Sequence, residues 1–144
     1  MHYRWRGLSF AAPEGRDETH LSIVDAAAPP RWTFDVRVDA PDPGARPIDA
    51  AALEAFVDAQ GVPPGVTRGA RAARQAGGAP AVVVEQQLVG EGTVLLQRQA
   101  FVARGPEVVI ATMTMRAGAK REAEVAFTRW LDTLTFDRDP EATR

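Results

Sequence analysis

The chain has 144 residues, of which 45% are hydrophobic and 25% are charged, and its formal net charge is −2. This length fits one domain with a sizeable core, while the charge gives no electrostatic case for binding nucleic acid or an anionic membrane surface. The absence of cysteine excludes disulfides, thiolate nucleophiles and cysteine-ligated metals.

The N-terminal residues show no targeting pattern. Residues 1–7 are polar and resemble a strand, without the apolar stretch that a secretory signal needs. No apolar run in the sequence approaches the roughly 20 residues that cross a bilayer. We therefore expect a cytoplasmic protein without stable membrane insertion.

Short strands are predicted in the N-terminal part of the chain. Residues 3–10 contain one strand or two, and residues 19–24 form the next, with Leu21 and Ile23 on one face. Residues 32–39 alternate apolar and polar side chains most regularly, which is typical of a half-buried strand.

A first helix is predicted after a proline-containing loop. Asp49 suits the N-cap position, and Ile48 before it can pack on Leu53 as a hydrophobic staple. Leu53, Phe56 and Val57 then form an apolar stripe at helical spacing. The following Gly-Val-Pro-Pro-Gly stretch ends the helix.

The segment 66–76 fits two structures. Arg68, Arg71 and Arg74 are spaced three apart, which places them on one side of a helix, but a strand with exposed arginines fits equally well. Nucleic-acid binding by this stripe is not expected, because it has no interleaved aromatic residues and the chain is not basic overall.

The C-terminal half predicts a run of antiparallel strands and a closing helix. Residues 81–88, 92–102 and 108–115 are strand-like and are separated by glycine-containing turns. Residues 120–133 form a helix whose apolar face consists of Ala123, Ala126, Phe127, Trp130, Leu131 and Leu134.

This order of elements predicts an α+β fold in a single domain, residues 1–137, with a charged and flexible tail at 138–144. We expect a twisted antiparallel sheet of about six or seven strands, with two helices packed on one side. The last strands are apolar on both faces near their middles. Two helices on one side would therefore leave an apolar face of the sheet uncovered and available to a partner.

No pattern of an enzyme is present. His2 and His20 are far apart in the sequence. Two histidines at the protein surface are a simpler interpretation than a metal site built on His20 and Asp17. The glycine pairs are not followed by the Lys-Ser/Thr of a phosphate loop. We expect no catalysis, no metal and no cofactor.

Glutamines mark the candidate site. Gln86, Gln87, Gln97 and Gln99 lie on neighbouring predicted strands, and they are either polar residues on a solvated sheet face or hydrogen-bonding groups in a groove for a hydrophobic helix. The second interpretation gives the candidate partner-binding residues Leu21, Ile23, Leu95, Gln97 and Gln99.

Four short patterns cover nearly the whole chain. They are a Phe-x-x-Pro-x-Gly-x-Asp-x-Thr pattern over residues 10–19, the helix stripe of Leu53, Phe56 and Val57, a hairpin at 91–101, and a closing helix that ends in Trp130–Phe136. In this order they resemble the DcrB-like family, which shares its fold with PsbP-like and Mog-type α/β sandwiches.

Within that family, the Gln-Arg-Gln-Ala sequence at 97–100 is similar to the cytoplasmic Eag-type branch. These proteins are chaperones that hold the N-terminal transmembrane segments of effectors before type VI secretion. The resemblance implies a non-catalytic chaperone or adaptor, acting as a homodimer on the hydrophobic N-terminal segment of a secreted effector. An immunity-like or regulatory domain that grips a folded partner through the same sheet is the alternative, and an enzyme is the third.

Overall fold

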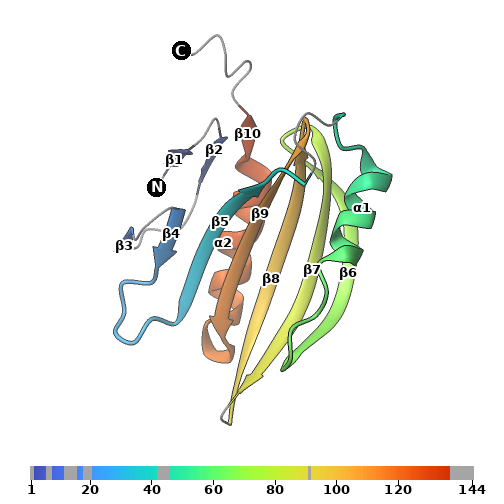
Figure 1. Cartoon of the computed structure of the whole chain (residues 1–144). Coiled ribbons are helices and arrows are strands. Elements are labelled where there is room, and N and C mark those ends of the chain that lie inside the picture. The colour runs from blue at the N-terminus through green and yellow to red at the C-terminus, as the bar shows by residue number, and fades with distance from the viewer. Residues whose placement is uncertain are drawn as a thin grey trace.

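The computed structural model describes residues 2–5, 8–11, 16–17, 21–41, 46–90 and 92–136, with side chains described from residue 21 onward. A seven-stranded antiparallel sheet in the order β3-β4-β5-β9-β8-β7-β6 forms the body of the molecule, and a three-stranded sheet in the order β1-β2-β10 lies beside it (Figure 1). The predicted 138–144 tail, and His20, lie outside the described residues.

The elements have the following bounds. The large sheet consists of β3 (Arg16–Asp17), β4 (Leu21–Val24), β5 (Trp32–Asp39), β6 (Val66–Ala76), β7 (Ala79–Gly90), β8 (Thr93–Arg104) and β9 (Glu107–Arg116). The small sheet consists of β1 (His2–Trp5), β2 (Leu8–Ala11) and β10 (Thr135–Phe136). The helices are α1 (Ala50–Ala59), the short 3₁₀ turn η1 (Ala117–Ala119) and α2 (Lys120–Thr133).

The four long strands β6 to β9 follow one another as hairpins. Gly78 and Gly105 adopt φ angles of +77° and +56° in two of the connecting turns. Residues that carry a Cβ atom rarely adopt this backbone conformation. The β8 strand pairs with β7 and β9 along its length, so Val82, Phe101 and Ile110 lie in one row across the sheet.

The two helices cover opposite faces of this sheet. Leu53 and Val57 of α1 are buried on a face formed by Val82, Val84, Phe101, Ala103, Val108 and Ile110. The buried face of α2 packs on the alternate side chains, which include Val102, Val109, Ala111, Met113 and Met115. Successive side chains of a strand point to opposite faces, so the two helices lie on different sides of β8 and β9.

The α+β class, the single domain and the twisted antiparallel sheet are confirmed, whereas the helices do not share one side as expected. The physical reason is that β8 and β9 are apolar on both faces where they pair: Phe101, Val102, Val109 and Ile110 are all buried. Each face of that region needs its own cover.

The segment of the three arginines is the strand β6 rather than a helix, and it ties the sheet edge to both helices. A register shift between Arg68 and Arg71 indicates a β-bulge, which brings these two side chains to the same face. Arg71 pairs with Glu54 and, at 2.6 Å, with Asp58 of α1.

Arg74 follows three residues later without a bulge, so its side chain lies on the other face of the sheet. There its Nη2 lies 3.0 Å from the Oδ1 of Asp132 in α2. The three arginines therefore project from a strand toward two different helices, and their spacing of three does not reflect one face of a helix.

The loop between β4 and β5 is fixed by a buried carboxylate. Asp25 accepts hydrogen bonds from the backbone N–H of Arg31 at 3.0 Å and from its Nε at 2.8 Å. These hydrogen bonds, the side-chain bond first, lower the pKa of Asp25 to about 2. Arg31 also reaches Glu122 of α2, with an Nη1–Oε2 distance of 3.3 Å.

Candidate binding groove

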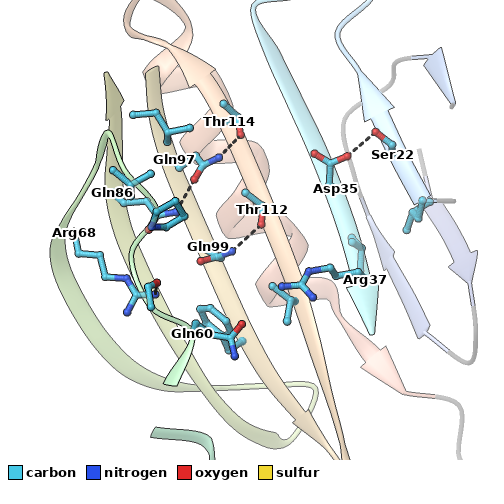
Figure 2. Close-up of a pocket in the computed structure, with 18 of the residues that line it drawn as sticks. Ser22, Asp35, Arg37, Gln60, Arg68, Gln86, Gln97, Gln99, Thr112 and Thr114 are labelled. Atoms are coloured by element: carbon cyan, nitrogen blue, oxygen red, sulfur yellow. Dashed lines mark hydrogen bonds between the residues drawn. The ribbon is translucent and has the colours of Figure 1, made fainter. Parts of the chain in front are cut away.

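The helix α1 covers only part of its face of the sheet. It has 10 residues, or about 15 Å of helix, while β8 beneath it has 12 residues, or about 40 Å of strand. Beside α1 the uncovered face forms a hollow of about 690 Å³, bounded by β4 and β5 on one side and by the loop after α1 on the other (Figure 2). We call this hollow the groove.

The floor of the groove is a ladder of amides and hydroxyls across three strands. Gln86 donates from Nε2 to the Oε1 of Gln97 at 2.6 Å, and Gln97 donates in turn to the Oγ1 of Thr114 at 2.8 Å. Gln99 donates to the Oγ1 of Thr112 at 3.2 Å. These partners are directly opposite in the β7–β8–β9 register, so the ladder follows from strand pairing (Figure 2).

The ladder uses amide donors and leaves acceptors available. Within the described part of the chain, the Oε1 atoms of Gln86 and Gln99 accept no hydrogen bond, and both side chains are half-buried. An amide oxygen has two acceptor positions. The floor can therefore accept hydrogen bonds or polarised C–H groups from a molecule that lies on it.

Apolar side chains surround this polar floor. Phe101 and Ile110 lie at the end near α1, while Val66 and Leu88 lie toward the β7–β8 hairpin. The chain after α1 adds Pro63 and Pro64, a rigid wall because proline fixes its own φ angle. The groove thus offers apolar contact along its sides and hydrogen-bonding groups along its middle.

The rim carries charges of both signs. On β5, Asp35 accepts a hydrogen bond of 2.6 Å from the Oγ of Ser22, and Arg37 lies two residues further on the same face. On the opposite wall, Arg68 donates to the carbonyl oxygens of Val57 and Gly61 at the end of α1. Figure 2 shows Arg37 and Arg68 on opposite sides of the floor. This mixture does not form a basic surface of the kind that binds nucleic acid.

The structure brings three of the five predicted partner-binding residues to this face. Gln97 and Gln99 form the centre of the floor, and Leu95 lies on the same face of β8, nearer the hairpin. The prediction is wrong for Ile23, which is fully buried on the other face beside Phe34 and the α2 side chains.

Leu21 is in phase with Ile23 and also belongs to the α2-side core, although it reaches the edge of the groove with 8% of its surface exposed. The sequence predicts both residues on an uncovered face. The aromatic contact between Phe34 and Trp130, with ring centroids 5.8 Å apart, shows that α2 covers that face.

Several floor and rim residues were not predicted, among them Thr112, Thr114, Asp35 and Arg37. Thr112 and Thr114 alternate with Ala111, Met113 and Met115 along β9, and this alternation was the available signal that one face of the strand is polar. Arg37 shows the same alternation on β5, but its role at the rim depends on β5 pairing with β9, which the sequence does not show.

Among the residues from 21 onward whose side chains are described, no three His, Asp or Glu side chains gather into a group that could hold a metal ion. The alternative of a metal site on His20 and Asp17 falls outside these residues, because His20 and the side chain of Asp17 are not described. Neither of the described α-helices is long and apolar enough to cross a bilayer.

Comparisons with known proteins identify the fold. No family model matches the sequence, and no curated protein matches it. Among solved structures, the chain is similar to PA94 of Pseudomonas aeruginosa, described as a protein of unknown function and putative regulator, with 24% identity and a TM-score of 0.59 over 89% of this chain and 90% of that one.

Two further structures share the fold at lower identity. LpqN of Mycobacterium tuberculosis, involved in cell envelope biogenesis, is 14% identical with a TM-score of 0.66 over 90% of this chain and 83% of its own. The cyanobacterial PsbP of Synechocystis is 12% identical with a TM-score of 0.64 over 94% and 91%. The chain therefore has a PsbP-like fold.

Proposed function

We propose that the chain is a non-catalytic binding module that shields a hydrophobic, transmembrane-type segment of another protein in the groove. The proposal rests on the amide–hydroxyl ladder in the groove. The ladder lies among apolar side chains, on the part of its sheet face that α1 does not cover, and consists of Gln86, Gln97, Gln99, Thr112 and Thr114.

The dimensions of the groove suit a single helix. Four strand spacings separate the rim strand β5 from β6, or about 19 Å at about 4.8 Å each. A helix with its side chains is about 10–12 Å across. One helix therefore fits between the rims and contacts the floor, whereas a folded domain would rest on the rims.

The chemistry of the groove suits an apolar helix that must later be released. Shielding on the order of 1,000 Å² of apolar surface gives a gross free energy of about 25 kcal/mol. Association and ordering costs remove most of that gain. The polar floor offers weaker contacts than a fully apolar one would, which favours reversible binding.

The resemblance to Eag-type proteins supports a specific partner. On that basis the occupant is the hydrophobic N-terminal segment of an effector destined for type VI secretion, and the chain acts in the cytoplasm as a homodimeric chaperone of the DcrB-like family. An immunity-like or regulatory domain that grips a folded partner remains the alternative hypothesis.

Binding of a synthetic apolar peptide tests the proposal. We expect a lysine-flanked helical peptide of about 20 Leu and Ala residues to bind the wild-type protein, and Gln97→Ala to weaken binding by about 1–3 kcal/mol. Gln87→Ala is the matched control, because Gln87 is exposed on the opposite face of the neighbouring strand. Equal binding by both variants would contradict the proposal.

A second arm separates the two partner classes. The protein is co-expressed with an effector that carries N-terminal transmembrane segments, and with the same effector lacking those segments. Capture of only the first supports the chaperone, whereas equal capture of both would favour a domain that grips a folded partner.

A further inference from the structure

The strand β6 forms one outer edge of the large sheet. The sheet order places it last, beside β7, and no other described strand pairs with it (Figure 1). Its 11 residues make it far longer than β3, the two-residue strand at the other edge. One side of the β6 backbone therefore presents N–H and C=O groups that no strand among the described elements satisfies.

The usual protection of an exposed edge is missing from the middle of β6. Natural edges are blunted by proline, by lysine or by a covering loop, and β6 contains neither proline nor lysine. The side chains of Ala70, Ala72 and Ala73 are short and exposed. The backbone of a partner can therefore approach this part of the strand without displacing a large side chain.

The arginines of β6 leave its edge open because they turn back over the sheet. Arg71 pairs with Glu54 and Asp58 of α1 on one face, and Arg74 pairs with Asp132 of α2 on the other. These ion pairs direct both guanidinium groups toward helices that pack on the inner strands. An arginine shields an edge only when its side chain extends beyond the strand, and these two do not.

The exposed edge is regular over a short run. A bulge interrupts the pairing with β7 before Arg71, and from there to Ala76 each residue of β6 lies opposite one residue of β7. Arg74 donates from its Nε to the carbonyl oxygen of Gln75 at 2.9 Å, which closes the far end of the run. We call residues 70–74 the β6 edge.

The charges beside the β6 edge favour a basic partner. The ion pairs of Arg71 and Arg74 combine two guanidinium groups with three carboxylates, so one negative charge is in surplus. The side chains of Glu54 and Asp58 remain 43% and 69% exposed, and they can therefore interact with a molecule that docks beside them. A second copy of the chain would bring the same surplus charge to the junction, and like charges oppose that pairing.

The spacing of the α1 contacts shows where a basic side chain would lie. Arg68 reaches the carbonyl oxygens at the end of α1, and Arg71 reaches Glu54 earlier in the helix. Ala73 is the next residue of β6 on this face, so it lies toward Glu54 and the start of α1. On an added strand, the residue opposite Ala73 lies beside Glu54, whereas a basic residue opposite Arg71 would meet a like charge.

We infer that the β6 edge is a docking surface for an extended segment of another protein, which adds to the large sheet as a further strand and places a basic side chain opposite Ala73. Strand addition of this kind gains its affinity from backbone hydrogen bonds and its selectivity from alternate side chains. None of residues 70–74 lines the groove, so the inference does not depend on the proposed function.

Peptides of about eight residues, one alternating Thr with Lys and one alternating Thr with Glu, test the inference. We expect the Thr/Lys peptide to bind the wild-type protein at least about tenfold more tightly than the Thr/Glu peptide, measured by fluorescence anisotropy. A Thr/Lys peptide with every backbone nitrogen methylated keeps its charge but donates no backbone hydrogen bond, so its binding should be lost. No binding by the Thr/Lys peptide, or equal binding by either of the other two, would overturn the inference.

Ala73→Lys locates the bound peptide, because it places a cation where the basic side chain of the segment would lie. This variant should weaken binding of the Thr/Lys peptide about tenfold, and Ala73→Ser, the matched control with a small side chain, should change it by less than about twofold. Thermal melts establish that both variants are folded. Equal effects of the two variants would place the peptide elsewhere and overturn the inference.

Sedimentation separates a second copy of the chain from a segment of another protein. A wild-type dimer that Ala73→Lys disrupts would show that the β6 edge pairs with another copy, and would overturn the inference. A sedimentation profile that Ala73→Lys leaves unchanged supports it. Gln97→Ala, on the floor of the groove, should leave binding of the Thr/Lys peptide unchanged, so the groove and the β6 edge are tested independently.

Discussion

The two faces of β8 and β9 differ in how they are completed. On the α2 face, Phe34, Met113 and Trp130 are buried with almost no exposed surface, and the ring contacts join sheet and helix. On the α1 face, burial is equally complete beneath α1 but gives way to Gln97 and Thr114 beyond it. The same strands therefore supply a closed core on one side and the open floor of the groove on the other.

Helix length therefore decides which part of each sheet face remains uncovered. The α2 helix has 14 residues and α1 has 10, and where α1 stops the side chains change from Phe and Ile to Gln and Thr. A polar residue on an uncovered face keeps contact with water, so it avoids the desolvation cost that it would meet beneath a helix.

The largest difference between the two faces is expected when the same charge is placed on each of them. Ile23→Asp buries a carboxylate in the α2-side core, so we expect a loss of at least about 4 kcal/mol or outright unfolding, measured by urea denaturation. Gln99→Asp places the same charge on the half-exposed floor, where folding should persist while peptide binding falls. A folded Ile23→Asp variant that no longer binds peptide would reverse our assignment of the faces.

The second prediction concerns the largest fully buried side chain of the α2 face. Trp130 is fully buried and contacts the rings of Phe34 and Phe127. Trp130→Ala should lower the free energy of unfolding by about 3–5 kcal/mol, because a large cavity remains. Val125→Ala on the exposed side of α2 is the control and should change it by less than about 0.5 kcal/mol.

These core and fold assignments could be predicted because they depend on local patterns. The alternation of Trp32, Phe34 and Val36 and the apolar stripe ending in Trp130 identified buried faces, and Asp49 caps α1 through its bond to the Ala52 N–H. The glutamine positions on β8 were found from their phase along the strand.

The face that each helix covers could not be predicted, because it depends on pairing between distant strands. The sequence shows that β4 is apolar at Leu21 and Ile23, but not that β5 and β9 bring these residues under α2. The bulge between Arg68 and Arg71 was similarly hidden, and it decides which arginine serves which helix. Both depend on register, which local sequence does not fix.

The smallest expected effect concerns acid stability on the α2 side. The folded-state pKa of Asp25, about 2, lies below the ordinary value of 3.8 because Arg31 donates to the carboxylate. The carboxylate therefore contributes stability above about pH 4, and this contribution is lost as the pH falls toward 2.

Thermal melts of Asp25→Asn and wild-type protein across this range check the assignment. The difference in melting temperature should be largest at neutral pH and should shrink between about pH 4 and about pH 2. A difference that does not change with pH would show that the hydrogen bonds of Asp25, and not its charge, stabilise the loop.

The most direct test of the groove is to follow side-chain signals from both faces by NMR while an apolar helical peptide of about 18 residues is titrated in. We expect the side-chain amide resonances of Gln86, Gln97 and Gln99 to shift as the peptide binds, while the indole N–H of Trp130 stays in place. Saturable shifts at Trp130 with unperturbed glutamine amides would contradict this expectation, because the peptide would then bind the α2 side and not the groove.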